Sequence, residues 1–289
     1  MCSVGELEQL LELSLAIDQI LRSDGTAVSE WVGDGSMIQS QMATENRASC
    51  VLLHGFTHTG ASWDRVVAAL KGGRRAIAPD IRGHGSAADA VPVSLDAVVE
   101  DVSRLAPERF TLAGYSMGGR IALHAALALP HRVQRLVLVG ASPGLADPAE
   151  RAARREADER LADQVEQMTI EQFATSWATT PVIAQQPPAI TVAVHADRLR
   201  NTSAGLARAL RGLGTGALAP VWDRLGGLRM PVTLVVGERD RKFAAIAAQV
   251  ARAITAGELG EVELVVVTGA GHAVHLEAPE RVAAVIAGG

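Results

Sequence analysis

The chain has 289 residues, 48% hydrophobic and 20% charged, which is a globular composition large enough for one domain or for one domain with an insertion. A net charge of −5, one tyrosine and four phenylalanines argue against a nucleic-acid or anionic-membrane partner. No stretch reaches the ~18 consecutive apolar residues of a membrane span, and we do not expect the acidic, leucine-rich N-terminus to be a signal peptide. The two cysteines, Cys2 and Cys50, form no C-x-x-C pair or disulfide framework, which predicts a reducing, cytoplasmic location.

Residues 1–47 precede the first clear core strand. Their leucine spacing, with acidic residues between, predicts an amphipathic helix, and two short apolar runs after it are compatible with a hairpin. We treat this segment as an N-terminal extension.

Six short apolar runs rich in β-branched residues follow. Their continuous apolar character predicts strands buried on both faces of a parallel sheet. Helical patterns lie between several of them, so the order predicts an α/β fold with a mostly parallel, doubly wound sheet. The predicted strands are 50–55, 75–80, 109–114, 135–140, 232–237 and 262–267, and the clearest helices are 62–70, 119–130 and 243–255.

The interval between the runs at 135–140 and 232–237 breaks this rhythm. It is helical in pattern and has no strong strand. The simplest interpretation is a helical cap, residues 144–225, inserted into a core made of residues 48–143 and 226–289.

The stretch LAGYSMGGR places Ser116 in a G-x-S-x-G motif between a predicted strand and a predicted helix. This context is typical of a nucleophile elbow, a tight turn that needs small neighbours and exposes the serine hydroxyl at the edge of the sheet. A structural serine in a glycine-rich turn is the alternative.

A catalytic serine needs a base, and the base needs an orienting acid. His272 follows the last predicted strand, and Asp240 follows the strand before it. His275 and Glu238 are their local competitors, and we expect them to pack, cap or pair instead. The resulting order of serine, aspartate and histidine is the one expected of α/β-hydrolases.

The stretch LLHGFTHTG follows the first core strand, where an oxyanion-hole loop belongs. The backbone N–H groups of Phe56 and Met117 are the candidate donors. We expect His54, Asp80 and His84 to fix loops rather than to catalyse. The eight histidines are dispersed, with no metal-ligand spacing and no phosphate- or dinucleotide-binding motif, so we predict no metal and no cofactor.

Six longer stretches carry a resemblance to known proteins. HGFTHTG, GYSMGGR and GHAVHLEAP are shared broadly across one superfamily, whereas three others are much more particular: SPGLADPAERAARR, LRNTSAGLARALRGLGTGALAPVWDRL and GERDRKF. With these motifs, the chain from about Cys50 to its end resembles the α/β-hydrolase superfamily. More narrowly, it resembles the family of 2-succinyl-6-hydroxy-2,4-cyclohexadiene-1-carboxylate synthases of menaquinone biosynthesis. The N-terminal extension departs from the short start that is usual in that family.

The resemblance implies a lyase. Members of that family eliminate pyruvate from 2-succinyl-5-enolpyruvyl-6-hydroxy-3-cyclohexene-1-carboxylate, with the triad serine as the base. Burial of three substrate carboxylates calls for guanidinium partners. The resemblance points to Arg120 and Arg200, to one or both of Arg151 and Arg154, and to Tyr115 and Trp177 as pocket-lining residues.

Each of these assignments has a structural alternative. In a chain with 27 basic residues of which only Lys71 and Lys242 are lysine, an arginine on a helix surface is usually a solvated ion-pair partner. Trp177 could belong to the core of the cap, and Tyr115 could pack beneath the elbow. The expected partner is a small polycarboxylate, and association of the chain with itself stays open.

Two other functions compete with the lyase. One is a carboxylesterase, or a C–C or thioester hydrolase, that uses Ser116 as a nucleophile. The other is a non-catalytic binding protein of the same fold, against which the intact triad argues.

Overall fold

The computed structural model describes residues 49–70, 74–180, 186–257 and 260–288. The helix and hairpin predicted within residues 1–47 lie outside these ranges. The described residues form a six-stranded sheet in which every pair of neighbouring strands is parallel. In spatial order its strands are β2 (Ala76–Ile77), β1 (Ser49–Leu53), β3 (Phe110–Tyr115), β4 (Val133–Val139), β5 (Val232–Gly237) and β6 (Val262–Val267).

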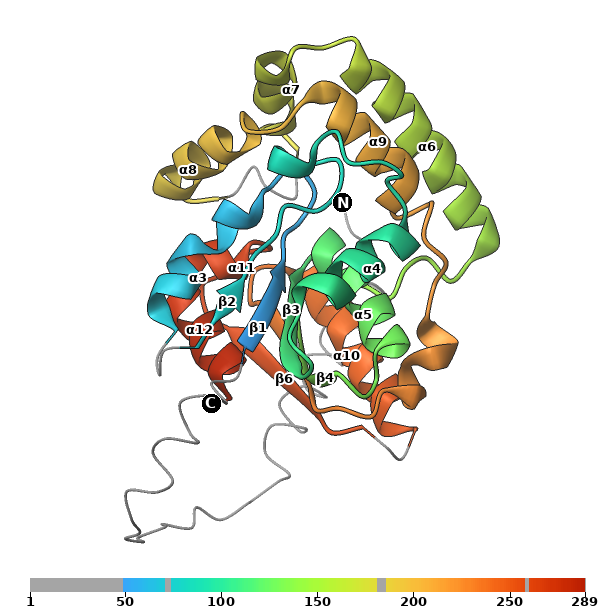
Figure 1. Cartoon of the computed structure of the whole chain (residues 1–289), viewed down its shortest axis with the longest axis vertical. Coiled ribbons are helices and arrows are strands. Elements are labelled where there is room, and N and C mark those ends of the chain that lie inside the picture. Colours follow the sequence, from blue (N-terminus) through green and yellow to red (C-terminus); the bar gives the residue numbers. More distant parts are fainter. Residues whose placement is uncertain (1–48, 71–73, 181–185, 258–259, 289) are drawn as a thin grey trace, which may run out of the picture. The chain divides into compact units, whose positions relative to one another are not determined.

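Helices cover both faces of this sheet, as Figure 1 shows. On one face, α4 (Leu95–Leu105), α5 (Met117–Ala128) and α10 (Arg241–Thr255) pack against side chains such as Val51 and Leu53. The other face, with Cys50 and Leu52, carries α3 (Asp64–Ala69), α11 (Val274–Glu277) and α12 (Pro279–Ala287). Because successive strand residues alternate between two buried faces, the strands are apolar throughout rather than alternating. The predicted fold class is confirmed.

One predicted strand is shorter than expected. The run at 75–80 forms only the two-residue edge strand β2. Pro79, which has no N–H to donate, follows closely, and Asp80 instead binds the backbone of neighbouring loops.

Between β4 and β5, the regular elements of the described residues are all helical. Four α-helices, α6 (Pro148–Glu166), α7 (Ile170–Trp177), α8 (Pro188–Arg198) and α9 (Ser203–Leu213), lie beyond the carboxyl ends of the strands (Figure 1). A separate apolar cluster from α6, α7 and α9 forms the interior of this cap. On the surface of α6 and α9, the Arg211 side chain of α9 forms ion pairs with three acidic side chains of α6, those of Glu159, Asp163 and Glu166.

Capping residues in the sequence stabilise the first turns of two of these helices. The Asp147 side chain accepts hydrogen bonds from the first N–H groups of α6, which has proline in its first turn. Thr169 and Gln172 form a reciprocal capping box on α7. Across the described ranges, none of the helices combines the length and the hydrophobicity needed to cross a bilayer.

Candidate active site

Ser116 lies at the turn between β3 and α5, with a φ of 52° and a ψ of −109°. A non-glycine residue with positive φ is strained and needs support from its surroundings. Here the Ser116 N–H donates to the Val139 carbonyl over 2.9 Å. A side chain at Gly118 would collide with the Leu53 carbonyl oxygen, so the elbow is closed tightly against β1. The turn therefore has the conformation of a nucleophile elbow.

The three predicted triad residues meet at this elbow. His272 Nε2 lies 3.2 Å from Ser116 Oγ, and His272 Nδ1 lies 2.6 Å from Asp240 Oδ2. Since an ionised carboxylate only accepts, Nδ1–H donates to Asp240 and leaves Nε2 to accept from the serine hydroxyl. The arrangement can take a proton from Ser116 and stabilise the resulting imidazolium.

Both competitors lie elsewhere. His275 is fully buried, with its ring centroid 4.1 Å from that of Tyr115 and 4.8 Å from that of Trp63. Glu238 accepts a hydrogen bond from the Gly269 N–H over 2.8 Å. Their packing and turn-forming contacts agree with the roles expected of them.

A cavity of about 290 Å³ opens in front of Ser116 and His272. Arg120, Arg154 and Lys242 contribute cationic groups to it, and no acidic side chain is among its described lining residues. Apolar side chains cover the rest, with Phe56, Met117, Trp177 and Phe243 prominent among them. We call this space the triad cavity. Its cationic and apolar lining suits an anionic ligand with apolar parts.

The two predicted oxyanion donors both border the triad cavity. Met117 is the first residue of α5, so its N–H has no partner within the helix. Within the described ranges, neither the Phe56 nor the Met117 N–H has a hydrogen-bond acceptor. Both donors are thus available to a negatively charged oxygen near Ser116.

Arg120 is a buried cation at the wall of the triad cavity. It lies one helical turn after Ser116 on α5, with only 8% of its surface exposed. Its Nε has no hydrogen-bond partner among the residues that the structure describes. Burial, and then the neighbouring Arg154, lower its pKa to about 10 against the opposing effect of the Asp158 carboxylate, so the guanidinium still carries its charge at neutral pH. A charge of this kind is costly unless an anion joins it.

Arg154 reaches the same cavity from the cap helix α6. Its Nε donates to Asp158 Oδ1 over 2.7 Å. Asp158 is buried and also accepts from the Gly216 N–H over 3.2 Å. Arg154 is therefore tethered by its Nε.

Trp177 also lines the triad cavity, and its ring meets that of Phe56 edge-on with centroids 5.3 Å apart. It packs on Phe173 as well, so it joins the interior of the cap to the cavity. Tyr115 does not border this cavity. It is buried beneath the elbow against His275.

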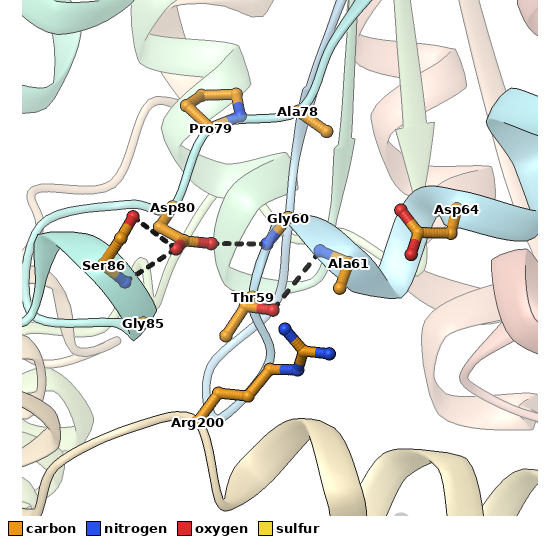
Figure 2. Close-up of a pocket in the computed structure, with 10 residues that line it drawn as sticks. All are labelled: Thr59, Gly60, Ala61, Asp64, Ala78, Pro79, Asp80, Gly85, Ser86 and Arg200. Atoms are coloured by element: carbon orange, nitrogen blue, oxygen red, sulfur yellow. Dashed lines mark hydrogen bonds between the residues drawn. The ribbon is translucent and has the colours of Figure 1, made fainter.

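The other two predicted arginines are not brought to the triad cavity. Arg151 is partly buried on α6 but is absent from the cavity lining. Arg200 lines a separate pocket with Thr59, Asp64 and Asp80, as Figure 2 shows, and 66% of its side chain is exposed. Its Nε lies 4.0 Å from Asp197.

Two cationic residues emerge that the sequence did not single out. Lys242 lines the triad cavity, and its place in the GERDRKF motif, two residues after Asp240, was the available signal. Arg198 is 2% exposed, donates from Nε to Thr57 Oγ1 over 3.3 Å, and has no described partner for Nη2. No local signal separates Arg198 from the exposed Arg200 two positions later.

Among the residues that the structure describes, no group of three or more histidine, cysteine or acidic side chains is arranged to hold a metal ion.

Known proteins share this fold and are similar to this chain in sequence. Residues 50–285 match the alpha/beta hydrolase family. The chain belongs to the alpha/beta hydrolase family. Like the relatives described next, it is an enzyme of this fold.

Sequence relatives of this hydrolase-fold enzyme carry one recurring name. The chain is 31% identical over 254 residues to the 2-succinyl-6-hydroxy-2,4-cyclohexadiene-1-carboxylate synthase of Serratia proteamaculans (strain 568), covering 84% of this chain and 93% of that protein. It is 35% identical over 239 residues to a Bacillus subtilis (strain 168) protein provisionally named as the same synthase, covering 79% and 85%. A solved structure, MenH from S. aureus, aligns with a TM-score of 0.76 and 28% identity over 84% of this chain and 92% of that one.

Proposed function

We propose that this enzyme is a carbon–oxygen lyase. It eliminates pyruvate from 2-succinyl-5-enolpyruvyl-6-hydroxy-3-cyclohexene-1-carboxylate and gives 2-succinyl-6-hydroxy-2,4-cyclohexadiene-1-carboxylate. The observation that carries the proposal is Arg120, a buried cation without a described partner for Nε, beside the Ser116–His272 pair. The relatives named as this synthase support the same reaction.

The proposed reaction needs a base and no water. The substrate ring has one double bond, between C3 and C4. The product ring has two, one between C2 and C3 and one between C4 and C5. A proton must therefore leave C2, beside the succinyl carbonyl, while the C5–oxygen bond breaks. The departing enolpyruvate takes up a proton on its methylene carbon and becomes pyruvate, so the atoms balance.

In this proposal Ser116 is the base. His272 accepts the hydroxyl proton at Nε2 while Asp240 stabilises the imidazolium from the other side, and Ser116 Oγ removes the proton from C2. Negative charge then develops on the succinyl carbonyl oxygen. The N–H groups of Phe56 and Met117, which border the cavity beside Ser116, are the proposed donors to that oxygen.

The substrate has three carboxylates, and the cavity offers three cationic groups. Arg120 and Arg154 are the proposed partners because guanidinium forks bind carboxylates bidentately and because both line the cavity. Lys242 adds a point charge at the same wall. Trp177 and Phe56 would contact the apolar parts of the ring.

The experiment offers the purified protein the enolpyruvyl substrate and, separately, short p-nitrophenyl esters. We expect fast pyruvate release and weak esterase activity. Rapid ester hydrolysis without pyruvate release would overturn the lyase assignment in favour of a carboxylesterase.

Ser116→Ala tests the base directly. It should abolish pyruvate release, because its methyl group cannot accept a proton. Ser176→Ala, on the exposed surface of α7, is the matched control and should keep the wild-type rate. Substantial turnover by Ser116→Ala would remove the serine from the reaction.

A further inference from the structure

The loop that carries the proposed oxyanion donor is strained. We call residues 56–59, between β1 and the 3-10 helix Gly60–Trp63, the oxyanion loop. Thr57, directly after Phe56, has a φ of 70° and is fully buried. A β-branched residue strongly disfavours this left-handed conformation, so surrounding contacts must hold it. The orientation of the Phe56 N–H depends on those contacts.

The core holds both ends of the oxyanion loop. Before the loop, His54 donates from Nδ1 to the Gly55 carbonyl and accepts at Nε2 from the Ile81 N–H, each over 2.9 Å. After the loop, Asp80 accepts from the Gly60 N–H over 2.7 Å, as Figure 2 shows. Within the core, the His58 N–H also donates to the Gly55 carbonyl over 3.1 Å and the Thr59 carbonyl accepts from Ser62. The Thr57 carbonyl and the Thr59 N–H are left to other partners.

Two residues of the cap supply those partners, and a third, Arg198, donates from Nε to Thr57 Oγ1 over 3.3 Å. Asn201 donates from Nδ2 to the Thr57 carbonyl over 3.0 Å. Asp197, near the end of α8, accepts from the Thr59 N–H over 3.0 Å and from the Thr59 hydroxyl. Both cap side chains are buried, with 3% of Asn201 and 8% of Asp197 exposed. The strained residue Thr57 is therefore bonded to the cap, through its carbonyl to Asn201 and through its hydroxyl to Arg198.

The contacts of Asn201 are specific in direction. Its Nδ2 serves Thr57 while its Oδ1 accepts from the Gly85 N–H over 3.0 Å, so one amide bridges two loops of the core. Asp197 is equally well satisfied. Burial alone would raise its pKa, but His58, 3.4 Å away, and the Thr59 donors hold it at about 2. Asp197 thus stays an acceptor throughout the neutral range.

We propose that Asp197 and Asn201 are positioning residues that hold Thr57 in its strained conformation and so keep the Phe56 N–H directed at the triad cavity. The cap thereby completes the oxyanion hole as well as covering it. Loss of either contact lets Thr57 relax and turns the neighbouring peptide away from the reacting oxygen. This inference rests on the proposed function of Phe56 as an oxyanion donor.

The test uses Asn201→Ala and Asp197→Asn in the full chain. Arg208→Ala is the matched control, because Arg208 also joins the cap to the core, donating to the Ala88 carbonyl over 2.7 Å, but far along the chain from the oxyanion loop. Two rates are measured, namely pyruvate release and phosphonylation of Ser116 by a fluorophosphonate probe. The second rate depends on the oxyanion hole without requiring the proposed substrate. Thermal unfolding shows that each variant is folded.

We expect both loop variants to lower kcat and the labelling rate by about tenfold or more, a part of the effect of deleting one oxyanion donor outright. KM should change by less than about threefold, because no substrate contact is removed. Arg208→Ala should keep both rates within about twofold of the wild type. A variant that misfolds is replaced by Asn201→Asp, which keeps the acceptor for Gly85 and loses the donor to Thr57.

Wild-type labelling rates in the loop variants would overturn the inference, and so would an equal loss in Arg208→Ala, which would indicate general loosening of the cap. Labelling of wild-type Ser116 without pyruvate release would defeat the proposed function alone, and the labelling rates of the variants would still decide the role of the cap. A wild-type protein that the probe does not label would overturn the inference together with the reactive serine.

Discussion

Arg154 and Asp158 form a hydrogen-bonded ion pair one helical turn apart on α6, with Nε and Oδ1 2.7 Å apart. The pair is asymmetric, because 47% of the Arg154 side chain is exposed and only 5% of the Asp158 side chain. Asp158 also binds the Gly216 N–H. One carboxylate thus anchors both a cationic group of the triad cavity and the loop after α9.

Asp158→Ala should lower the free energy of unfolding by about 1–3 kcal/mol, because the buried Gly216 N–H loses its acceptor. Urea unfolding measures the change. Glu156→Ala is the control, since its pair with Arg160 is long, at 3.8 Å, and solvated. It should change stability by less than about 0.5 kcal/mol. Equal effects of the two variants would contradict this account of Asp158.

Arg120→Met should separate stability from activity. Removing a buried charge without a described partner for Nε should leave the ligand-free protein as stable as the wild type or about 1 kcal/mol more stable. On a carboxylate substrate, kcat/KM should fall about a hundredfold, which corresponds to ~3 kcal/mol. Thermal unfolding and steady-state kinetics measure the two effects.

Arg132→Met is the opposite case. Arg132 binds Ser103 and the carbonyls of Ala106 and Pro107, outside the triad cavity. Its loss should reduce stability and leave the kinetics unchanged. If Arg120→Met behaved like Arg132→Met, Arg120 would be a structural residue.

Gly118→Ala should prevent formation of the elbow. The added methyl group would overlap the Leu53 carbonyl oxygen, a backbone atom held in the central sheet, and would force β1 and α5 apart. We expect poor solubility or a loss of several kcal/mol of stability, on the scale of overpacking. Gly227→Ala has nothing within 4 Å of the new methyl group and should be neutral or slightly stabilising. Expression level and thermal unfolding compare the two.

Stability should fall as the pH drops below about 6.5, the pKa of a histidine in the unfolded chain. Burial lowers the pKa of His54 to about 4 and that of His84 to about 3, so both stay neutral in the folded protein. Between those values and 6.5 the unfolded chain binds protons that the folded chain does not. The resulting loss is at most ~1.4 kcal/mol per pH unit for each group.

Urea unfolding at pH 8, 7, 6 and 5 measures this slope. His54→Asn keeps a donor for the Gly55 carbonyl and removes one titrating ring. It should be less stable at pH 8 and should show a shallower dependence on pH. A stability independent of pH between 8 and 5 would contradict the assignment.

The position of the triad could be predicted because it depends on the sheet. Ser116, Asp240 and His272 each follow a separate parallel strand, and the carboxyl ends of parallel strands meet at one edge. The hydrophobic runs that mark the strands are visible in the sequence. The elbow could also be predicted from the sequence, because its glycines are needed for close packing between neighbouring segments.

The sequence did not predict which arginines of the cap face the triad cavity. The spacing of Arg151 and Arg154 places them one turn apart, yet only Arg154 lines the triad cavity. Arg198 is buried while Arg200 is exposed, although both stand in one short stretch of the sequence. Spacing determines which side chains neighbour one another on a helix, but the packing of the whole helix determines which of them face inward.

By itself, therefore, the sequence determined the α/β fold, the order of its strands along the chain and the three triad residues that meet at the elbow. Only the tertiary structure decided which cations surround the triad cavity and that Asn201 supports Thr57, 144 positions away. The first set follows from local patterns of hydrophobicity and backbone conformation. The second depends on how the cap docks onto the core, and contacts between segments so far apart leave no pattern in either one alone.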